Sequence, residues 1–454
     1  MGEENQGTAV TSPVTEAELA AFHEVVGKLR TLPVDDPVRL RAERVAASFA
    51  RDGRLRRRRA RGDEASAADA ATMAATATGA LDRREDAALA DGGRGGAFRR
   101  PRTCYVCKTP YREVDTFYHR LCPACAADNT RRRSLSTDLS GRRVLLTGGR
   151  VKIGFRLALM MLRDGAETVV TSRFPHDTVR RFRAEPGSAQ WLDRLTVLAV
   201  DLRDPRQVLG LCEELRQEGE PFDILVNNAA QTVRRPPQSY ALLAAGEYDA
   251  LPEGARRAPG FTSMRMLEGL GGSVSALPAA LREADEAGLL PDPSPENSWS
   301  ARLGALDPAE VLETQLVNAL APALLCDRLL PLLLASPHPR RYVINVTAVE
   351  GRFAVRNKMP GHPHTNMAKA ALNMLTRTSA AALAEQGVHM CAVDTGWITD
   401  ENPAPKKARM AGAGFRTPLD IVDGAARVYD PIVRGEAGHP VSGVFLKDYQ
   451  EAQW

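Results

Sequence analysis

The chain has few cysteines, few aromatic residues and almost no excess of charge. Seven cysteines in 454 residues are too few for a secreted disulfide scaffold. Aromatic residues make up 5% and the formal net charge is +4, which is too small to mark the whole chain as a nucleic-acid binder. No apolar run approaches the ~18 residues that a membrane span requires. The acidic, polar start MGEENQGTAV is not a secretory signal, so we expect a cytoplasmic protein that does not engage a membrane.

Beyond residue 139, apolar strands alternate with segments of helical length. Hydrophobic residues make up 44% of the chain, which excludes wholesale disorder. The strand-like runs are RVLLTG, TVVTS, LTVLAVD, DILVNNA, RYVINVT, VHMCAVD and VSGVFL. Continuous apolar strands separated by helices indicate a parallel sheet covered on both faces. The fold class predicted for residues 139–454 is therefore α/β, a doubly wound parallel sheet of the Rossmann type.

Residues 1–100 predict a helical and partly disordered region. Apolar residues at helical spacing after Thr15, a suitable N-cap, indicate a helix over 16–32. A second helix is expected from Pro37 to about Ala50. Residues 63–96 are rich in Ala, Asp and Gly, which is typical of a flexible or marginally helical tether.

One run in this region, Arg51 to Arg61, holds seven arginines against a single aspartate. Such a run could bind the phosphates of a nucleic acid without recognising its base sequence. It also fits a solvated linker or the end of a helix. No aromatic residues are interleaved for base stacking, so nucleic acid is not among the expected partners.

A long insertion interrupts the α/β pattern at about residues 231–305. It follows DILVNNAA, at the carboxyl end of a strand, which is the edge where such folds bind ligands. A short helix is expected over 277–286. The insertion is interpreted as a lid or substrate-specificity element, with an oligomer contact or surface elaboration as alternatives.

Residues 101–138 contain two C-x-x-C pairs, separated by 14 residues. The four thiolates of Cys104, Cys107, Cys122 and Cys125 could hold one tetrahedral ion, and zinc suits four soft ligands in a reducing compartment. His119 could replace one thiolate, and a redox dithiol is a further alternative. A closed four-ligand site would organise structure and would not catalyse.

A glycine-rich loop, TGGRVKIG, follows the first strand of the α/β region and opens its first helix. That position brings backbone N–H groups and the positive end of a helix to a pyrophosphate. Lys152 stands where a glycine is usual, so its ammonium either contacts phosphate or partly blocks the loop. Arg173, after the second strand, can pair with a 2′-phosphate, which favours NADP over NAD.

The order of these motifs resembles the short-chain dehydrogenase/reductase family. The resemblance rests on TGGRVKIG, Asp201, NNAA, Asn318, NVTAVEG, Lys369 in MAKAALNM, and DTGWITD, and it covers roughly residues 140–450 apart from the insertion. It implies a Rossmann-type domain with a nicotinamide cofactor at the carboxyl ends of the strands, a small-molecule substrate and a homo-oligomer. The cofactor-binding residues it implies, with those indicated by the loop itself, are Gly148, Gly149, Arg150, Lys152, Ile153, Gly154, Arg173, Asp201, Leu202, Asn228, Ala229 and Lys369.

The family moves a proton with a Tyr-x-x-x-Lys pair, a serine and an asparagine, and this chain departs from that set. Lys369 and Asn318 match, but Thr365 stands at the tyrosine position and Ala348 at the serine position. A threonine hydroxyl is a far weaker acid than a phenol. The remaining candidates for the acid–base step are Thr347, His362 and His364, and a histidine titrates in the required range. We expect an NADP-dependent oxidoreductase acting on a carbonyl or alcohol with atypical acid–base residues. The alternative is a catalytically silent dinucleotide-binding scaffold whose zinc module contacts partners.

Overall fold

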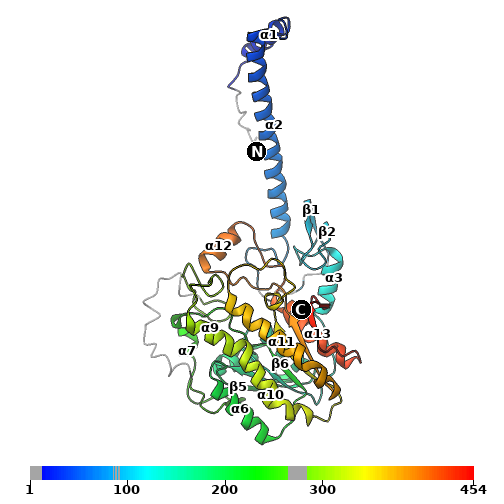
Figure 1. The fold of residues 1–454 in the computed structure, drawn as a ribbon, viewed down its shortest axis with the longest axis vertical. Helices are drawn as coiled ribbons and strands as arrows, with labels where there is room; N and C mark the ends of the chain where they lie inside the picture. Colours follow the sequence, from blue (N-terminus) through cyan, green and yellow to red (C-terminus); the bar gives the residue numbers. More distant parts are fainter. Residues whose placement is uncertain (1–12, 85, 87–88, 90–92, 264–283) are drawn as a thin grey trace, which may run out of the picture. The chain divides into compact units, whose positions relative to one another are not determined.

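The computed structural model describes residues 13–84, 86, 89, 93–263 and 284–454 (Figure 1). The chain divides into two compact units, Met1–Asp69 and Ala70–Trp454. The helix expected over 277–286 lies mostly outside the described residues.

The first unit is built from two helices. Helix α1 (Glu16–Arg30) begins at Thr15, whose hydroxyl accepts the N–H of Glu18 while the Glu18 carboxylate accepts the N–H of Thr15. This reciprocal cap confirms the expected helix start. Helix α2 (Pro37–Ala74) is 38 residues long, so the prediction that it ends near Ala50 is wrong. Arginine and alanine are strong helix formers, and they carry the helix through Gly53 and Gly62 into the segment predicted to be a tether.

The second unit contains a nine-stranded sheet in the order β11-β10-β9-β8-β6-β3-β4-β5-β7. All seven predicted strands are present. The strands are β3 (Arg143–Leu146), β4 (Glu167–Ser172), β5 (Leu195–Ala199), β6 (Ile224–Asn227), β7 (Ala255–Arg257), β8 (Arg341–Thr347), β9 (Val388–Asp394), β10 (Phe445–Lys447) and β11 (Gln450–Ala452). Neighbouring strands are parallel except β10 and β11. The predicted doubly wound α/β fold is therefore confirmed.

Helices cover both faces of this sheet and bury two apolar cores. One core is formed with α4 (Lys152–Arg163), α5 (Pro175–Ala184) and α13 (Ile421–Glu436). The other is formed with α6 (Pro205–Glu218), α10 (Ala321–Leu334) and α11 (Pro363–Glu385). Helix α9 (Pro308–Gln315) leads through a π-helical turn, Leu316–Leu320, into α10. Helix α12 (Ala404–Gly412) lies in the segment between β9 and α13.

The continuous helical segment Pro308–Leu334 corrects one expectation from the sequence. Its 27 residues are long and apolar enough to cross a membrane by length and composition, although no such run was expected. Leu325, Leu329 and Leu333 face the sheet and are buried. Leu312 and Leu320 on the same segment are more than half exposed. The segment is thus apolar toward the core and also toward the outside.

The insertion packs against the edge of the sheet and against α5. Strand β7 extends the sheet by pairing with β5, and a short helix, α7 (Ala241–Ala245), follows a 3₁₀ turn, Pro237–Tyr240. The Glu247 carboxylate is fully buried and accepts the backbone N–H groups of His176 and Asp177 at the start of α5. A carboxylate at a helix N-terminus is favoured by the helix dipole, so this contact fixes the insertion to α5.

The cysteine-containing region pairs β1 (Arg94–Thr103) with β2 (Pro110–Asp115) and ends in α3 (Pro123–Arg132). The strand β1 begins within the residues that were predicted to be a tether. Phe98, Tyr118 and Leu121 of this region share one apolar core with Leu419 and Ile421, which lie at the start of α13. The region is therefore packed directly against the α/β domain.

Candidate functional site

The glycine-rich loop is held against the end of β6 by hydrogen bonds. The Thr147 hydroxyl accepts the N–H groups of Asn228 and Ala229, each at 3.0 Å. The Asn228 amide donates to the carbonyls of Thr147 and Gly148. A Cβ atom on Gly154 would lie 2.0 Å from the Gly148 carbonyl oxygen, so no side chain fits there. The predicted loop residues therefore form one packed turn at the start of α4.

The two cations of this loop are engaged with neighbouring acids. Lys152 has φ +54, a left-handed backbone that normally favours glycine. Its Nζ lies 3.7 Å from a carboxylate oxygen of Glu401, in the segment after β9. Arg150 donates to Asp177 at 2.7 Å and to the Ala287 carbonyl of the insertion at 2.8 Å. The lysine at the glycine position thus reaches from the loop to the segment that follows β9.

Arg173 lies at the end of β4, between aromatic rings. Its guanidinium carbon is 5.6 Å from the centroid of Phe174 and 5.3 Å from that of Tyr240, and the two rings stack at 17°. In the part of the chain that the structure describes, no carboxylate forms an ion pair with it. Arg173 is therefore a half-buried cation with its charge available for an anion.

Asp201 follows β5, and its carboxylate is held by Arg203 at 2.6 Å. Burial would raise the pKa of Asp201, but the hydrogen bonds from Arg203 and the nearby charge of Arg173 lower it. Leu202, the next residue, is 8% exposed and packs into the core beside α6. The predicted adenosine-side residues thus gather at the carboxyl ends of β4 and β5.

Lys369 lies on α11 and is buried against the end of β8. Its Nζ donates to the Val346 carbonyl at 2.9 Å. Burial lowers the pKa of Lys369 to about 8, although the charges of Glu350 and Asp394 act in the opposite direction. Among the described residues this buried amine has one hydrogen-bond partner, so two of its N–H groups are available to donate to a ligand hydroxyl.

Asn318 occupies the π-helical turn between α9 and α10. Its side chain accepts the N–H of Gln231 at 2.7 Å and donates to the carbonyl of the same residue at 2.9 Å. Such π-helical turns occur often at functional sites. Asn318 therefore fixes the first residue of the insertion next to the site.

The two threonine hydroxyls considered for the acid–base step, those of Thr347 and Thr365, have different hydrogen-bond surroundings. The Thr347 hydroxyl donates to the Lys369 carbonyl at 3.4 Å, and its side chain lies on the face of the sheet that α11 covers. Ala348 follows it at the vacant serine position. Thr365 is 4% exposed, and among the described residues its hydroxyl has no hydrogen-bond partner. Thr347 thus supports α11, and Thr365 presents the unsatisfied hydroxyl.

Two histidines precede Thr365, and the structure separates their roles. His362 stacks on Trp299 of the insertion, with ring centroids 3.7 Å apart, and its Nδ1 bonds the Trp299 carbonyl. His364 is fully buried, and neither ring nitrogen has a hydrogen-bond partner within the described residues. Its Nε2 lies 3.9 Å from a carboxylate oxygen of Glu310 on α9. Burial lowers the pKa of His364 and raises that of Glu310.

Sequence reasoning missed Asp394, the last residue of β9. It lies opposite Thr347 in the sheet register, is 4% exposed, and accepts one long N–H contact of 3.4 Å from Gly396. Burial raises the pKa of Asp394 to about 6, with Glu350 and Asp448 adding to the effect and Lys447 opposing it. The motif DTGWITD contained the signal, because a carboxylate at the buried end of a strand is costly unless it has a role.

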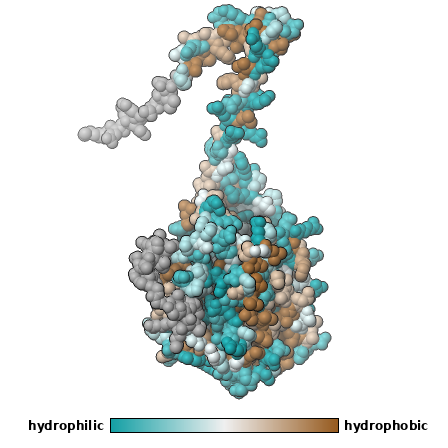
Figure 2. All heavy atoms as spheres, turned by 60° about the vertical axis from the view of Figure 1, so that its left-hand side comes forward, coloured by the Kyte–Doolittle hydropathy of each residue, from teal (hydrophilic) through white to brown (hydrophobic). Residues whose placement is uncertain are grey.

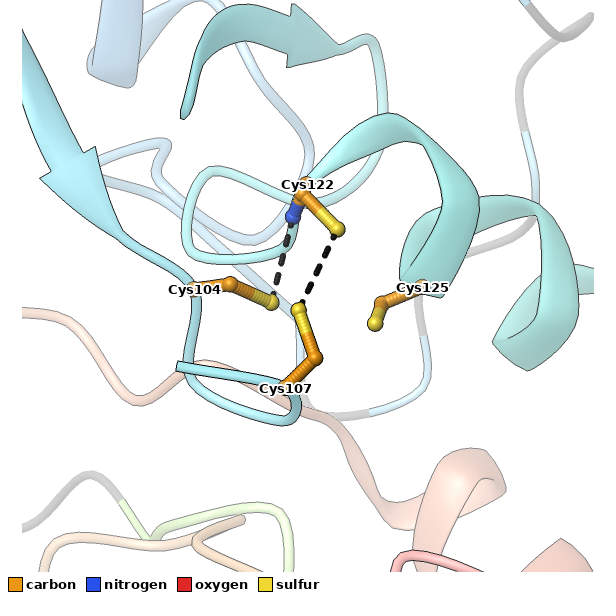
Figure 3. Close-up of side chains that lie close together, drawn as sticks. All are labelled: Cys104, Cys107, Cys122 and Cys125. Atoms are coloured by element: carbon orange, nitrogen blue, oxygen red, sulfur yellow. Dashed lines mark hydrogen bonds between the residues drawn. The ribbon is translucent and has the colours of Figure 1, made fainter. Parts of the chain in front are cut away.

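The four cysteines of the two C-x-x-C pairs converge (Figure 3). Their sulfur atoms all lie within 4.8 Å of one another, and the Cys107 and Cys122 sulfurs are 3.6 Å apart. That distance is too long for a disulfide and close to the ~3.8 Å between thiolates that share one tetrahedral zinc. His119 instead bonds the Thr78 hydroxyl through Nδ1 at 2.8 Å and is not part of the cluster. The donor set therefore fits zinc with four thiolates.

Comparisons with known proteins agree with this geometry. The family model described as short chain dehydrogenase matches residues 142–245, and the one described as enoyl-(acyl carrier protein) reductase matches residues 294–413. An uncharacterized protein of Acanthamoeba polyphaga mimivirus is 31% identical over 346 residues, which is 73% of this chain and 71% of that protein.

Other similar proteins match over shorter stretches or at lower identity. A peroxisomal 2,4-dienoyl-CoA reductase of Danio rerio is 33% identical over 95 residues, 20% of this chain and 30% of that enzyme. A short chain dehydrogenase from Burkholderia cenocepacia, solved in complex with NADP, is 20% identical with a TM-score of 0.46, and the match covers 68% of this chain and 97% of that one. The two family models and the order of the site residues lead to one conclusion: over residues 142–245 and 294–413 the chain is similar to the short-chain dehydrogenase/reductase family.

Proposed function

We propose that the protein is an NADP-dependent oxidoreductase that acts on a carbonyl or alcohol substrate without a catalytic tyrosine. The proposal rests on the position of Lys369. Its buried amine lies at the carboxyl ends of the central strands and has N–H groups available beyond the one bonded to Val346. A purely structural lysine would be expected at the surface or in an ion pair. As the family resemblance implies, Lys369 would hold the cofactor ribose.

The residues present fit the cofactor. The N–H groups of Gly148 and Gly149 are bonded to Thr171. Helix α4 has no side-chain cap at Val151, so the N–H groups of its first turn would bind a diphosphate, and Lys152 can add its ammonium. Arg173 fits a 2′-phosphate, because its guanidinium forms no ion pair with a carboxylate in the described chain; nearby Asp201 is paired with Arg203. NADPH supplies a hydride when it is bound; the protein must bind it, exclude water and deliver a proton.

For the proton we propose the buried pair formed by His364 and Glu310. The ring of His364 has two unsatisfied nitrogens, and the Glu310 carboxyl has an unsatisfied oxygen, so the pair can hold and pass one proton next to Thr365. Asp394 is the second candidate, because burial at the end of β9 raises the pKa of its carboxyl to about 6.

Cofactor binding is tested by fluorescence titration with NADPH and NADH. Arg173→Ala should weaken NADPH binding by about 10- to 100-fold, because one charge-assisted phosphate contact is lost, and should leave NADH binding within about twofold. Arg203→Ala, which removes a guanidinium already paired with Asp201, is the matched control. Equal loss for the two nucleotides would contradict the preference for NADP, and no binding of either would overturn the enzyme proposal.

The proton donor is tested by turnover of NADPH with a panel of aldehydes, ketones and enoyl thioesters. The thioesters are included because one matching family model is described as enoyl-(acyl carrier protein) reductase and one relative is named a 2,4-dienoyl-CoA reductase. His364→Gln should lower kcat by about 10²- to 10⁴-fold with the affinity for NADPH unchanged. Full activity in His364→Gln together with loss in Asp394→Asn would transfer the role to Asp394. Absence of turnover with normal NADPH binding would favour the silent scaffold.

We also propose that the four cysteines bind one structural zinc ion, since a site closed by four thiolates leaves no open position for a substrate.

We further propose a cytoplasmic location, because a reducing compartment keeps these thiols available. The exposed apolar residues Leu312, Leu320, Met367 and Met374 on the segment 308–334 and on α11 support the further proposal of a homo-oligomer.

A further inference from the structure

The arginine run Arg51–Arg61 lies in the middle of α2 and not in a linker or at a helix end. All seven of its arginines are exposed. In the part of the chain that the structure describes, Arg56 is the one that pairs with a carboxylate, that of Asp52, and the Arg56 side chain is still 78% exposed. Figure 2 shows mainly hydrophilic side chains along this helix. The run is thus a rigid, largely uncompensated block of positive charge.

The arginines surround the helix. Successive residues of an α-helix are rotated by 100°, so Arg51, Arg54, Arg58 and Arg61 form one stripe. Arg56, Arg57 and Arg59 lie at three other angles around the axis. A flat acidic surface, such as an anionic membrane or the face of an acidic protein, would contact only the stripe. A groove with a wall of phosphates on each side would contact nearly all seven.

We propose that α2 binds double-stranded DNA through residues 51–61, with the helix in the major groove and the arginines on the phosphates of both strands. The major groove of B-DNA admits an α-helix, whereas that of double-stranded RNA is too narrow. The run holds no aromatic residue, which disfavours single strands, since these are bound by stacking. Arginine contacts to phosphate carry no sequence information, so binding is independent of sequence. This inference does not depend on the proposed oxidoreductase activity.

The exposed apolar residues of the first unit do not favour a membrane over double-stranded DNA as the partner of α2. Phe22 and Val25 on α1 and Val45 and Phe49 on α2 are exposed and precede the arginine run. Within the run, Leu55 is a single exposed apolar side chain among seven arginines. The last turn of α1 has Lys28 and Arg30, while its first turn has Glu16 and Glu18, so α1 lacks the cationic face of a helix that lies on an anionic membrane.

The test is fluorescence anisotropy of the full-length protein with a labelled 20-base-pair duplex of arbitrary sequence. Binding should weaken by roughly 10³- to 10⁴-fold between 50 and 200 mM salt, the slope expected for about six to seven phosphate contacts. The variant carrying Arg54→Gln, Arg57→Gln, Arg58→Gln and Arg61→Gln should bind at least 30-fold more weakly at 50 mM salt. Circular dichroism verifies that its helix content is unchanged.

The control variant removes the same charge elsewhere, through substitution to glutamine of Arg94, Arg131, Arg180 and Arg206, whose side chains are 73–89% exposed. Its affinity should remain within twofold of the unmodified protein. The proposal is overturned by absence of duplex binding at 50 mM salt or by equal loss in both variants. Tighter binding of double-stranded RNA, of single strands or of vesicles with 30% phosphatidylserine also overturns it.

Discussion

Cys104→Ser should remove the metal from the purified protein and destabilise its second unit. Structural zinc in isolated zinc fingers is worth roughly 10–16 kcal/mol. In this protein a large apolar core remains without the metal, so we expect the free energy of unfolding to fall by only part of that amount, about 4 kcal/mol. Since each kcal/mol shifts the melting temperature of a large domain by about 2–4 °C, the expected loss is about 10 °C. Metal analysis and differential scanning calorimetry measure both effects.

The destabilisation should spread beyond the cysteines because the region is joined to α13 by buried polar contacts. The Arg133 guanidinium lies 2.6 Å from Asp420 and 3.2 Å from Asp423, and the Tyr118 hydroxyl donates to Asp423 at 2.5 Å. Opening the cysteine cluster would leave those buried carboxylates without their cation, which is strongly unfavourable.

Cys212→Ser is the matched control, because Cys212 is equally buried but lies in α6, away from the cluster. It should keep its metal and lose only the stability that one small buried substitution costs. A wild-type protein that is well folded and free of metal would contradict the zinc proposal.

Asp394→Asn should stabilise the protein at pH 8. Burial raises the pKa of this carboxyl from 3.8 to about 6, so the folded state binds its proton more tightly than the unfolded state. Stability therefore falls as pH rises from about 4 to about 6, and the cost stays in place above that range. At 1.36 kcal/mol per pKa unit the cost is about 3 kcal/mol, and asparagine avoids it. Thermal unfolding at pH 8 and pH 4 measures the difference, which should shrink at the lower pH.

The substitution Asp448→Asn, at a neighbouring position, should change the stability at pH 8 in the opposite direction. Burial would raise the pKa of Asp448, but Arg427 and Lys447 lower it, and Arg427 is almost completely buried. Removing the carboxylate leaves the buried guanidinium of Arg427 with neutral hydrogen-bond partners and without its ion pair, which should destabilise the protein at pH 8. If both variants lose stability, Asp394 is an ordinary structural carboxylate. If Asp394→Asn gains stability and loses turnover, the carboxylate is retained for its chemistry.

Local sequence patterns were sufficient for the parts of the fold that depend on neighbouring residues. Seven strands of the nine-stranded sheet, the loop from Thr147 to Gly154 and the four cysteines are each defined by short spacings, and these were predicted. The short strands β7 and β11 were not. The end of α2 was not predicted, because the Ala-, Asp- and Gly-rich composition of residues 63–96 was interpreted as a flexible or marginally helical tether, whereas the alanines continue the helix to Ala74.

The missing parts of the site depend on packing between distant elements. His364 meets Glu310 only because α11 packs on α9. Asp394 acquires its environment from β8, β10 and the turn at Glu350. Neither pairing leaves a spacing in the sequence, since more than 40 residues separate the partners. The insertion likewise gave no pattern that would reveal Trp299 stacking on His362.

Strand β7 has a consequence for the protein in concentrated solution. The exposed edge of a sheet is a template on which a second chain can add a strand. Without the insertion that edge would be β5, five residues of LTVLA. With it, the edge is a three-residue strand of sequence ARR, and short, charged edges are poor templates. The insertion therefore protects the sheet from edge-to-edge aggregation, whatever else its loops do near the site.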